Sequence, residues 1–154
     1  MPSLFPRQRL IRMNKNILRW VLIAICTYSA WSHFNGIIKE LYDPVFRHLP
    51  MPSNYISYFI CFTDLFFGIA FIYLIYLLLV RPDSSSKLLL LTFIFDSIIH
   101  LSMYILVLFT LFHRVWVTTK YQIPISPTVL LPFIPHIIMV VIAFMYYYKV
   151  RKSA

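Results

Sequence analysis

The amino-acid sequence predicts an all-α membrane protein, a four-transmembrane-helix bundle, on three observations. Hydrophobic residues make up 60% of the 154 residues and charged residues only 12%, whereas soluble domains are about half apolar and about a quarter charged. The mean hydropathy is +0.77. The apolar residues also form long runs with short polar connectors between them, so lipid is the solvent that this composition requires.

Four apolar stretches approach the roughly 20 residues that a helix needs to cross a bilayer. They cover residues 17–38, 56–80, 88–112 and 128–148. These stretches are too long for strands and do not alternate in polarity. The connectors are too short for a soluble domain, so we expect one membrane domain over residues 1–154. The first stretch is followed by no small-x-small cleavage site, so we expect a span there rather than a signal peptide.

The basic residues predict the orientation of the spans. Ten of them lie beside the two termini or the connector 81–87, and four lie on the opposite side. The ten are Arg7, Arg9, Arg12, Lys15, Arg19, Arg81, Lys87, Lys149, Arg151 and Lys152, and the four are Lys39, Arg47, Arg114 and Lys120. Because cytosolic flanks carry the basic excess, both termini are expected to be cytosolic. Flanking of spans also accounts for the net charge of +9 without nucleic acid as a partner, since no basic helix with a reading face occurs.

Arg151 and Lys152 lie fourth and third, respectively, from the end of the sequence. This pattern resembles the dibasic retrieval signal of endoplasmic-reticulum membrane proteins, which acts in the cytosol. It therefore predicts a multi-pass protein of the endoplasmic-reticulum membrane. The alternative is that both residues only mark the cytosolic flank of the last span.

Cys26 and Cys61 both lie inside apolar stretches. Neither belongs to a CxxC motif or has a His or Cys neighbour at ligand spacing, so we expect no disulfide framework, no metal site and no cofactor. The thiols are expected to pack as small apolar groups.

Five ionisable residues lie where lipid disfavours them: His33, Asp64, Asp96, His100 and His136. A carboxylate at the centre of a span costs at least roughly 2.5 kcal/mol, so it must face protein, water or a partner. At 1.5 Å per residue, Asp64 and His136 lie about 12 Å below the lumenal face and His33 about 8 Å below it. Asp96 and His100 are four residues apart, so they share a helix face and are able to pair.

Each of these residues has a structural alternative to a ligand site. A histidine inside a span can serve only as a hydrogen-bonding contact between helices. Asp64 needs a partner from another span, because its own stretch holds no basic residue. Pro132 and Pro135 precede His136, and the predicted kink would open the bundle on its lumenal half.

Residues 31–43, WSHFNGIIKELYD, change from apolar to charged as the first stretch ends. His33 and Asn35 are expected to face the bundle. Glu40 and Asp43 are expected at the lipid–water boundary, either folded over a pocket or solvated.

The chain resembles the EXPERA family of four-helix endoplasmic-reticulum proteins, which includes the sigma-2 receptor and a sterol isomerase. The resemblance rests on SH at 32–33, ELYDPVFRHL at 40–49, YFICFTDLFF at 58–67 and IFDSIIH at 94–100. It implies a membrane cavity that accepts sterols or hydrophobic amines. In that cavity Asp64 would meet the cation of the ligand, with Glu40 or Asp43 as a second acid and His33 nearby.

The sequence departs from two patterns within this family. Ile37 stands where the isomerase places a Glu one turn after the histidine of its first span. The Asp-Gln pair of the sigma-2 type is missing as well. These departures favour a ligand-binding or regulatory protein over an enzyme.

The predicted ligand site therefore comprises His33, Glu40, Asp43, Asp64, Asp96, His100 and His136. The expected partner is a membrane lipid or sterol. The sequence also leaves open whether the protein forms a homodimer or binds another membrane protein. Two alternatives are a sterol double-bond isomerase, which needs an acid and a base, and a non-catalytic accessory or trafficking subunit of MARVEL or lysosomal-transmembrane type. In the second alternative the buried acids would pair with a helix of the partner.

Overall fold

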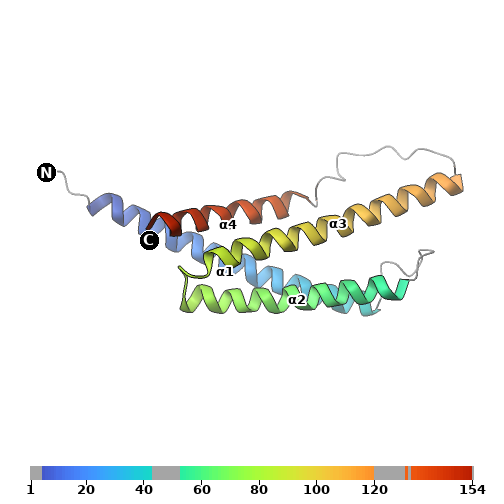
Figure 1. Ribbon diagram of the computed structural model, residues 1–154, viewed down its shortest axis with the longest axis horizontal. Coiled ribbons are helices and arrows are strands. Elements are labelled where there is room, and N and C mark those ends of the chain that lie inside the picture. The colour runs from blue at the N-terminus through green and yellow to red at the C-terminus, as the bar shows by residue number, and fades with distance from the viewer. Residues whose placement is uncertain (1–4, 43–52, 120–130, 132, 154) are drawn as a thin grey trace.

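The computed structural model describes residues 5–42, 53–119, 131 and 133–153 and contains four helices in the described residues (Figure 1). The helices are α1 (Phe5–Tyr42), α2 (Ser53–Val80), α3 (Ser86–Thr119) and α4 (Phe133–Ser153). All four are long and apolar enough to cross a membrane. The predicted fold class is thereby confirmed, and the chain is a multi-pass membrane protein.

Consecutive helices run in opposite directions along the bundle (Figure 1). The start of α1, the α2–α3 turn and the end of α4 lie at the same end. Of the predicted stretches, 17–38 and 88–112 lie inside helices that continue beyond both limits of each stretch. The helical extensions are polar or mixed, so apolarity marks the part of a helix that faces lipid rather than the whole helix.

The turn between α2 and α3 is held by proline and serine. Pro82 disfavours a helical conformation at the preceding residue, and α2 ends at Val80. Ser85 Oγ then donates to the Pro82 carbonyl oxygen at 2.9 Å, and Ser86 Oγ to the Asp83 carbonyl oxygen at 3.3 Å. These short-range bonds close the turn just before α3 begins, as serine does at helix starts.

The expected proline kink in the last span is not what the structure shows. The helix α4 begins at Phe133, so Pro135 is in its first turn, where a missing backbone N–H costs nothing. Residues 128–130 and Pro132 of the predicted stretch 128–148 lie outside the described residues. Pro135 therefore marks where the helix starts rather than a break within it.

The helices pack as two pairs, with α1 mainly against α2 and α3 against α4. The contact between α2 and α3 is sparse by comparison. An apolar core fills the half of the bundle near the α2–α3 turn. Its fully buried members include Leu22, Phe71, Leu78, Phe93 and Tyr146. Cys26 belongs to this core, and Cys26 and Cys61 are both free thiols.

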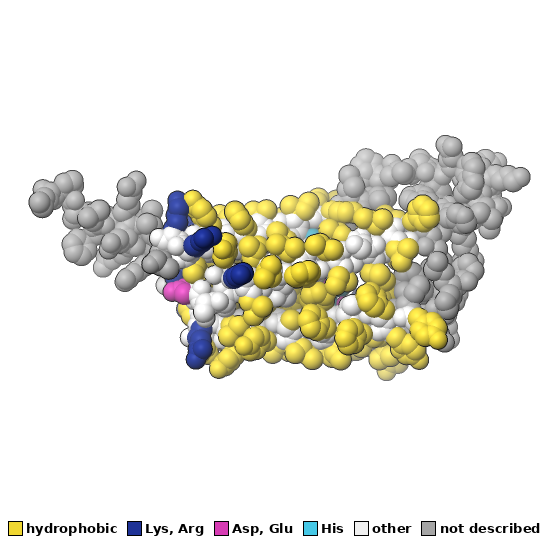
Figure 2. Space-filling view, in the orientation of Figure 1, with side chains coloured by type: hydrophobic (Ala, Val, Ile, Leu, Met, Phe, Trp, Pro, Cys, Tyr) yellow, Lys and Arg dark blue, Asp and Glu magenta, His cyan; other side chains and the backbone are white. Residues whose placement is uncertain are grey.

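The outer surface is that of a protein in lipid. Figure 2 shows hydrophobic side chains along the length of the bundle, with Lys and Arg at the end that holds the α2–α3 turn. Large side chains such as Trp20, Phe66 and Phe109 are exposed. At the basic end, Lys15 Nζ lies 2.5 Å from Asp83 Oδ1, and Tyr146 Oη donates to the Pro82 carbonyl oxygen at 2.9 Å. These two contacts connect α1 and α4 to the turn.

Replacing Tyr146 by Phe is expected to lower the free energy of unfolding by about 1 kcal/mol, because it removes one buried hydrogen bond and leaves the ring in place. Reversible unfolding of the purified protein in a mild detergent measures this. Tyr148→Phe is the matched control, since Tyr148 lies on the same helix and is half exposed. Equal stability of the two variants would contradict the proposed role of the bond.

Candidate functional site

A cavity of about 320 Å³ lies between the four helices. Every helix contributes a polar residue to its lining. They are His33 of α1, Asp64 of α2, Asp96 and His100 of α3, and His136 of α4. The structure thus brings together the five ionisable residues that the sequence placed inside the spans.

Four of these residues form a closed set of contacts that we call the imidazole–carboxylate cluster: His33, Asp64, Asp96 and His100. Asp64 Oδ1 lies 2.9 Å from His33 Nδ1 and 3.3 Å from His100 Nε2. Asp96 Oδ1 lies 3.3 Å from His33 Nε2 and 2.9 Å from His100 Nδ1. Each imidazole therefore lies between the two carboxylates, and each carboxylate between the two imidazoles.

The four nitrogen–oxygen contacts of the cluster need more N–H groups than two neutral histidines supply. A neutral imidazole carries one N–H and one acceptor nitrogen. Two neutral rings provide two N–H groups for four nitrogen–oxygen contacts. The two remaining nitrogens then face a carboxylate with a lone pair, which is repulsive unless a further proton or another cation lies there.

The two carboxylates are not equivalent. Asp64 Oδ1 has hydrogen-bond geometry toward both rings. Asp96 Oδ1 is buried and has no aligned hydrogen-bond donor among the described residues, although two ring nitrogens are close to it. His100 Nδ1 is aligned instead with the Asp96 carbonyl oxygen, at 3.0 Å.

Aromatic rings fix the orientation of His33. Its imidazole stacks on Phe67 and Phe71 of α2, with centroid distances of 5.8 and 5.5 Å. His100 in turn stacks on His136 of α4 at 6.1 Å. Stacking leaves the ring edges, which carry the nitrogens, directed at the carboxylates.

The cluster joins the two helix pairs. His33 and Asp64 come from the α1–α2 pair, and Asp96 and His100 come from α3 (Figure 1). The contacts from His33 to Asp96 and from His100 to Asp64 both cross between the pairs. Polar side-chain contacts therefore join the two helix pairs.

Gly36 makes room for the Asp64 carboxylate. A Cβ at Gly36 would lie 2.6 Å from Asp64 Oδ2, closer than side-chain atoms approach. The other glycine, Gly68, faces the Phe34 ring, with 3.1 Å from a built Cβ to its nearest atom. Gly36 and Asp64 both line the cavity.

The remaining predicted site residues lie elsewhere. Glu40 is buried between α1 and α2, where Ser57 Oγ donates to its Oε1 at 2.5 Å, and it does not line the cavity. Asp43 lies outside the described residues. Arg151 and Lys152 are exposed in the last turn of α4, where Lys152 Nζ lies 4.6 Å from the centre of the Tyr148 ring.

Some lining residues had not been predicted from the sequence as site residues. Tyr28, Pro135 and Met139 contribute apolar walls, and Ser29 Oγ contacts Met139 Sδ at 3.8 Å. Their residue types are common in any span, so the sequence held no signal for them. For Gly36 the sequence did hold a signal, because Gly36 is one of only 2 glycines in the chain.

Comparison of this chain with protein-family models, with curated proteins and with solved structures gives no match. The fold and the site thus define a four-helix membrane protein with an intramembrane polar cavity.

Gly36→Ala is expected to lower the free energy of unfolding, although alanine favours helices over glycine by about 1 kcal/mol. The added methyl group displaces the Asp64 carboxylate, and a buried bond to a charged group is worth about 1.5–3 kcal/mol. Unfolding in detergent measures the change. Gly68→Ala is the control, because the atoms nearest to its added methyl group belong to the Phe34 ring rather than to a carboxylate. A Gly36→Ala protein as stable as the control would contradict this packing role.

Proposed function

We propose that this protein binds a sterol-like or hydrophobic amine ligand in its intramembrane cavity, in the endoplasmic-reticulum membrane. The observation that carries the proposal is the convergence of four helices on one cavity with two buried carboxylates. A protein that used these residues only as contacts between helices would gain nothing from a cavity beside them. By extension, the protein would regulate sterol or lipid homeostasis or trafficking.

The size of the cavity favours a ligand that is only partly enclosed. Its volume of about 320 Å³ is at the lower end of the roughly 300–1,000 Å³ of small-molecule sites. The polar end of an amphiphile would occupy the cavity, and its apolar body would lie against the walls formed by Tyr28 and Met139 and in the surrounding lipid. Such a ligand reaches the site from the bilayer.

The charge distribution favours a cationic end group. Asp64 uses Oδ1 for both histidines, and its Oδ2 faces Gly36 at the cavity wall. An ammonium group that binds there supplies the positive charge that two carboxylates require in a medium of low dielectric constant. Asp64 is therefore the residue that we propose to meet the ligand.

The EXPERA resemblance is consistent with this proposal. The segments that carry it contain His33, Asp64, Asp96 and His100, and these four form the cluster. Membership of that family is part of the proposal. Glu40 has no part in it, because its carboxylate bonds to Ser57 away from the cavity.

A sterol isomerase is the second candidate. The cluster places two imidazoles and two carboxylates within contact distance, and an isomerase needs one group to donate a proton and another to remove one. Growth of isomerase-deficient cells that express this chain would favour the enzyme. The accessory-subunit alternative is weaker, since the side chains that contact the Asp96 carboxylate, His33 and His100, belong to its own chain.

Asp64→Asn is expected to remove the preference for a cation. The probes are an aminosterol and the matching hydroxysterol, and the protein is reconstituted in lipid nanodiscs. Wild type is expected to bind the amine at least about tenfold more tightly, which corresponds to about 1.4 kcal/mol. In the variant both probes are expected to bind alike.

Asp83→Asn is the matched control, because Asp83 is a carboxylate at the basic end, beside Lys15. It is expected to keep the preference for the amine. The ligand proposal fails if wild type does not distinguish the two probes, or if Asp64→Asn distinguishes them as well as wild type does.

The proposed location has its own test. Replacing Arg151 and Lys152 together by serine is expected to shift the protein, tagged at its N-terminus, from the endoplasmic reticulum to later membranes, as seen by microscopy. Lys149→Ser is the control, because Lys149 is a basic residue two positions before Arg151 on the same helix. An unchanged distribution of the double variant would count against retrieval by these residues.

A further inference from the structure

We propose that His33, Asp96 and His100 form a binding site for a divalent transition-metal ion such as Zn²⁺, oriented by Asp64. The ligand atoms would be His33 Nε2, His100 Nδ1 and Asp96 Oδ1. This proposal does not rest on the amine-binding function, because it concerns an inorganic ion and needs no organic ligand. The ion would take the place of the ammonium group as the positive charge beside the two carboxylates.

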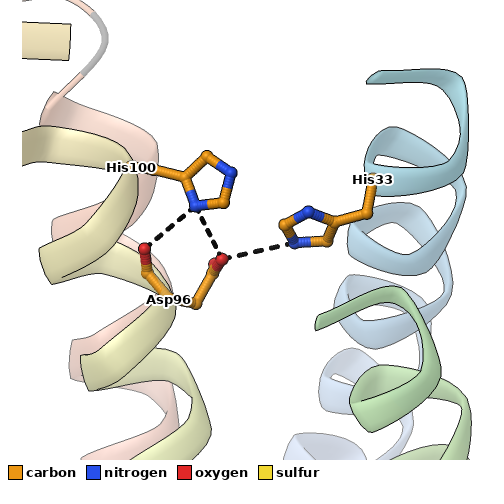
Figure 3. A group of neighbouring side chains, drawn as sticks. All are labelled: His33, Asp96 and His100. Carbon is orange, nitrogen blue, oxygen red and sulfur yellow. Dashed lines mark hydrogen bonds and ion pairs between the residues drawn. The ribbon is translucent and has the colours of Figure 1, made fainter. Parts of the chain in front are cut away.

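The separations of these atoms fit a common ion. Ligand atoms of the three residues lie within 4.8 Å of one another. Asp96 Oδ1 is 2.9 Å from His100 Nδ1 and 3.3 Å from His33 Nε2 (Figure 3). Two atoms bound to one tetrahedral Zn²⁺ at 2.0–2.1 Å are about 3.3 Å apart. Only small rotations of the side chains would be needed to place an ion between them.

The bonding of Asp96 Oδ1 points to an ion rather than to a salt bridge. The side chain is only 4% exposed, and this oxygen has no aligned hydrogen-bond donor among the described residues. Buried carboxylate oxygens are almost always satisfied, so an unsatisfied one indicates a missing partner. Figure 3 shows both imidazoles directed toward Asp96. Close contact without N–H alignment is what ligands of a shared ion display.

Asp64 has the position of the carboxylate that supports metal-bound histidines. It lies 2.9 Å from His33 Nδ1 and 3.3 Å from His100 Nε2, both with hydrogen-bond geometry. These are the nitrogens that the proposed ion does not use. Metal-binding histidines generally donate their second N–H to a carboxylate or a carbonyl oxygen, which fixes the tautomer and the ring orientation.

Charge and donor type determine the class of ion. Two carboxylates, two neutral imidazoles and one divalent cation have no net charge, as a site inside lipid requires. The ion also removes the repulsion of the two nitrogen lone pairs that otherwise face carboxylates. Imidazole nitrogen selects Zn²⁺ and related transition metals, whereas Mg²⁺ and Ca²⁺ prefer sites made of oxygen atoms.

Binding has one identifiable cost. His100 Nδ1 also lies 3.0 Å from the Asp96 carbonyl oxygen and gives up that hydrogen bond when it binds the ion. The carbonyl lies inside α3 and keeps its helical bond. The His100 side chain is 33% exposed and lines the cavity, so the ion has a route to the site.

The test is metal binding by the full-length chain, purified in detergent and stripped with a chelator. Zn²⁺ is titrated by calorimetry, and Co²⁺ is used as a spectroscopic substitute. We expect one ion per chain, visible absorption from Co²⁺ in a site of low coordination number, and no displacement by an excess of Mg²⁺.

Two isosteric variants separate a ligand from a supporting residue. Asp64→Asn keeps an acceptor oxygen and is expected to weaken Zn²⁺ binding by about 10–100-fold, as loss of a supporting carboxylate does. Asp96→Asn removes a ligand and is expected to weaken binding further and to abolish the Co²⁺ absorption. Asp83→Asn is the control and is expected to bind like wild type.

Helix content and elution volume show whether each variant is folded. If Asp96→Asn does not fold, His33→Gln takes its place, because it removes a ligand nitrogen and keeps a polar side chain. The proposal is overturned if wild type binds no stoichiometric ion, or if the folded ligand variant binds Zn²⁺ as tightly as Asp83→Asn does.

Discussion

The structure depends on one constraint, which is that a carboxylate inside a membrane span must face polar or charged groups rather than lipid. Asp64 and Asp96 each meet it through the same two imidazoles, His33 and His100. Because neither acid has a histidine to itself, removal of one member changes the surroundings of the other three. The four residues therefore act as one unit, held by the stacking of His33 on Phe67 and Phe71.

The apolar core and the imidazole–carboxylate cluster hold the helices together in different parts of the bundle. Near the α2–α3 turn, side chains such as Phe71, Phe93 and Tyr146 fill the interior. Farther along, the filling gives way to a cavity, and polar contacts connect the two helix pairs there. Apolar side chains alone would hold the two pairs together only weakly at this depth, because lipid offers those side chains an equally good environment.

Much of the fold was predictable, and the site was predictable only in part. Spans follow from composition, and the pairing of Asp96 with His100 follows from their spacing on one helix. The meeting of His33 with Asp64 depends on how two helices rotate about their axes, which packing decides and residue spacing does not. The surroundings of Glu40 were not predictable for a related reason. The apolar stretch of the sequence ends before Glu40, but α1 continues to Tyr42 and turns the Glu40 side chain toward Ser57.

The contacts of Lys15 and Tyr146 with the α2–α3 turn have a mechanical consequence. They tie α1 and α4 to the point where α2 and α3 are already joined, so all four helices are fastened at that end. Toward the opposite end, the two pairs are connected by contacts of α1 with α4 and by the imidazole–carboxylate cluster. Any separation of the pairs would increase with distance from the turn, and the cluster is the set of contacts that resists it.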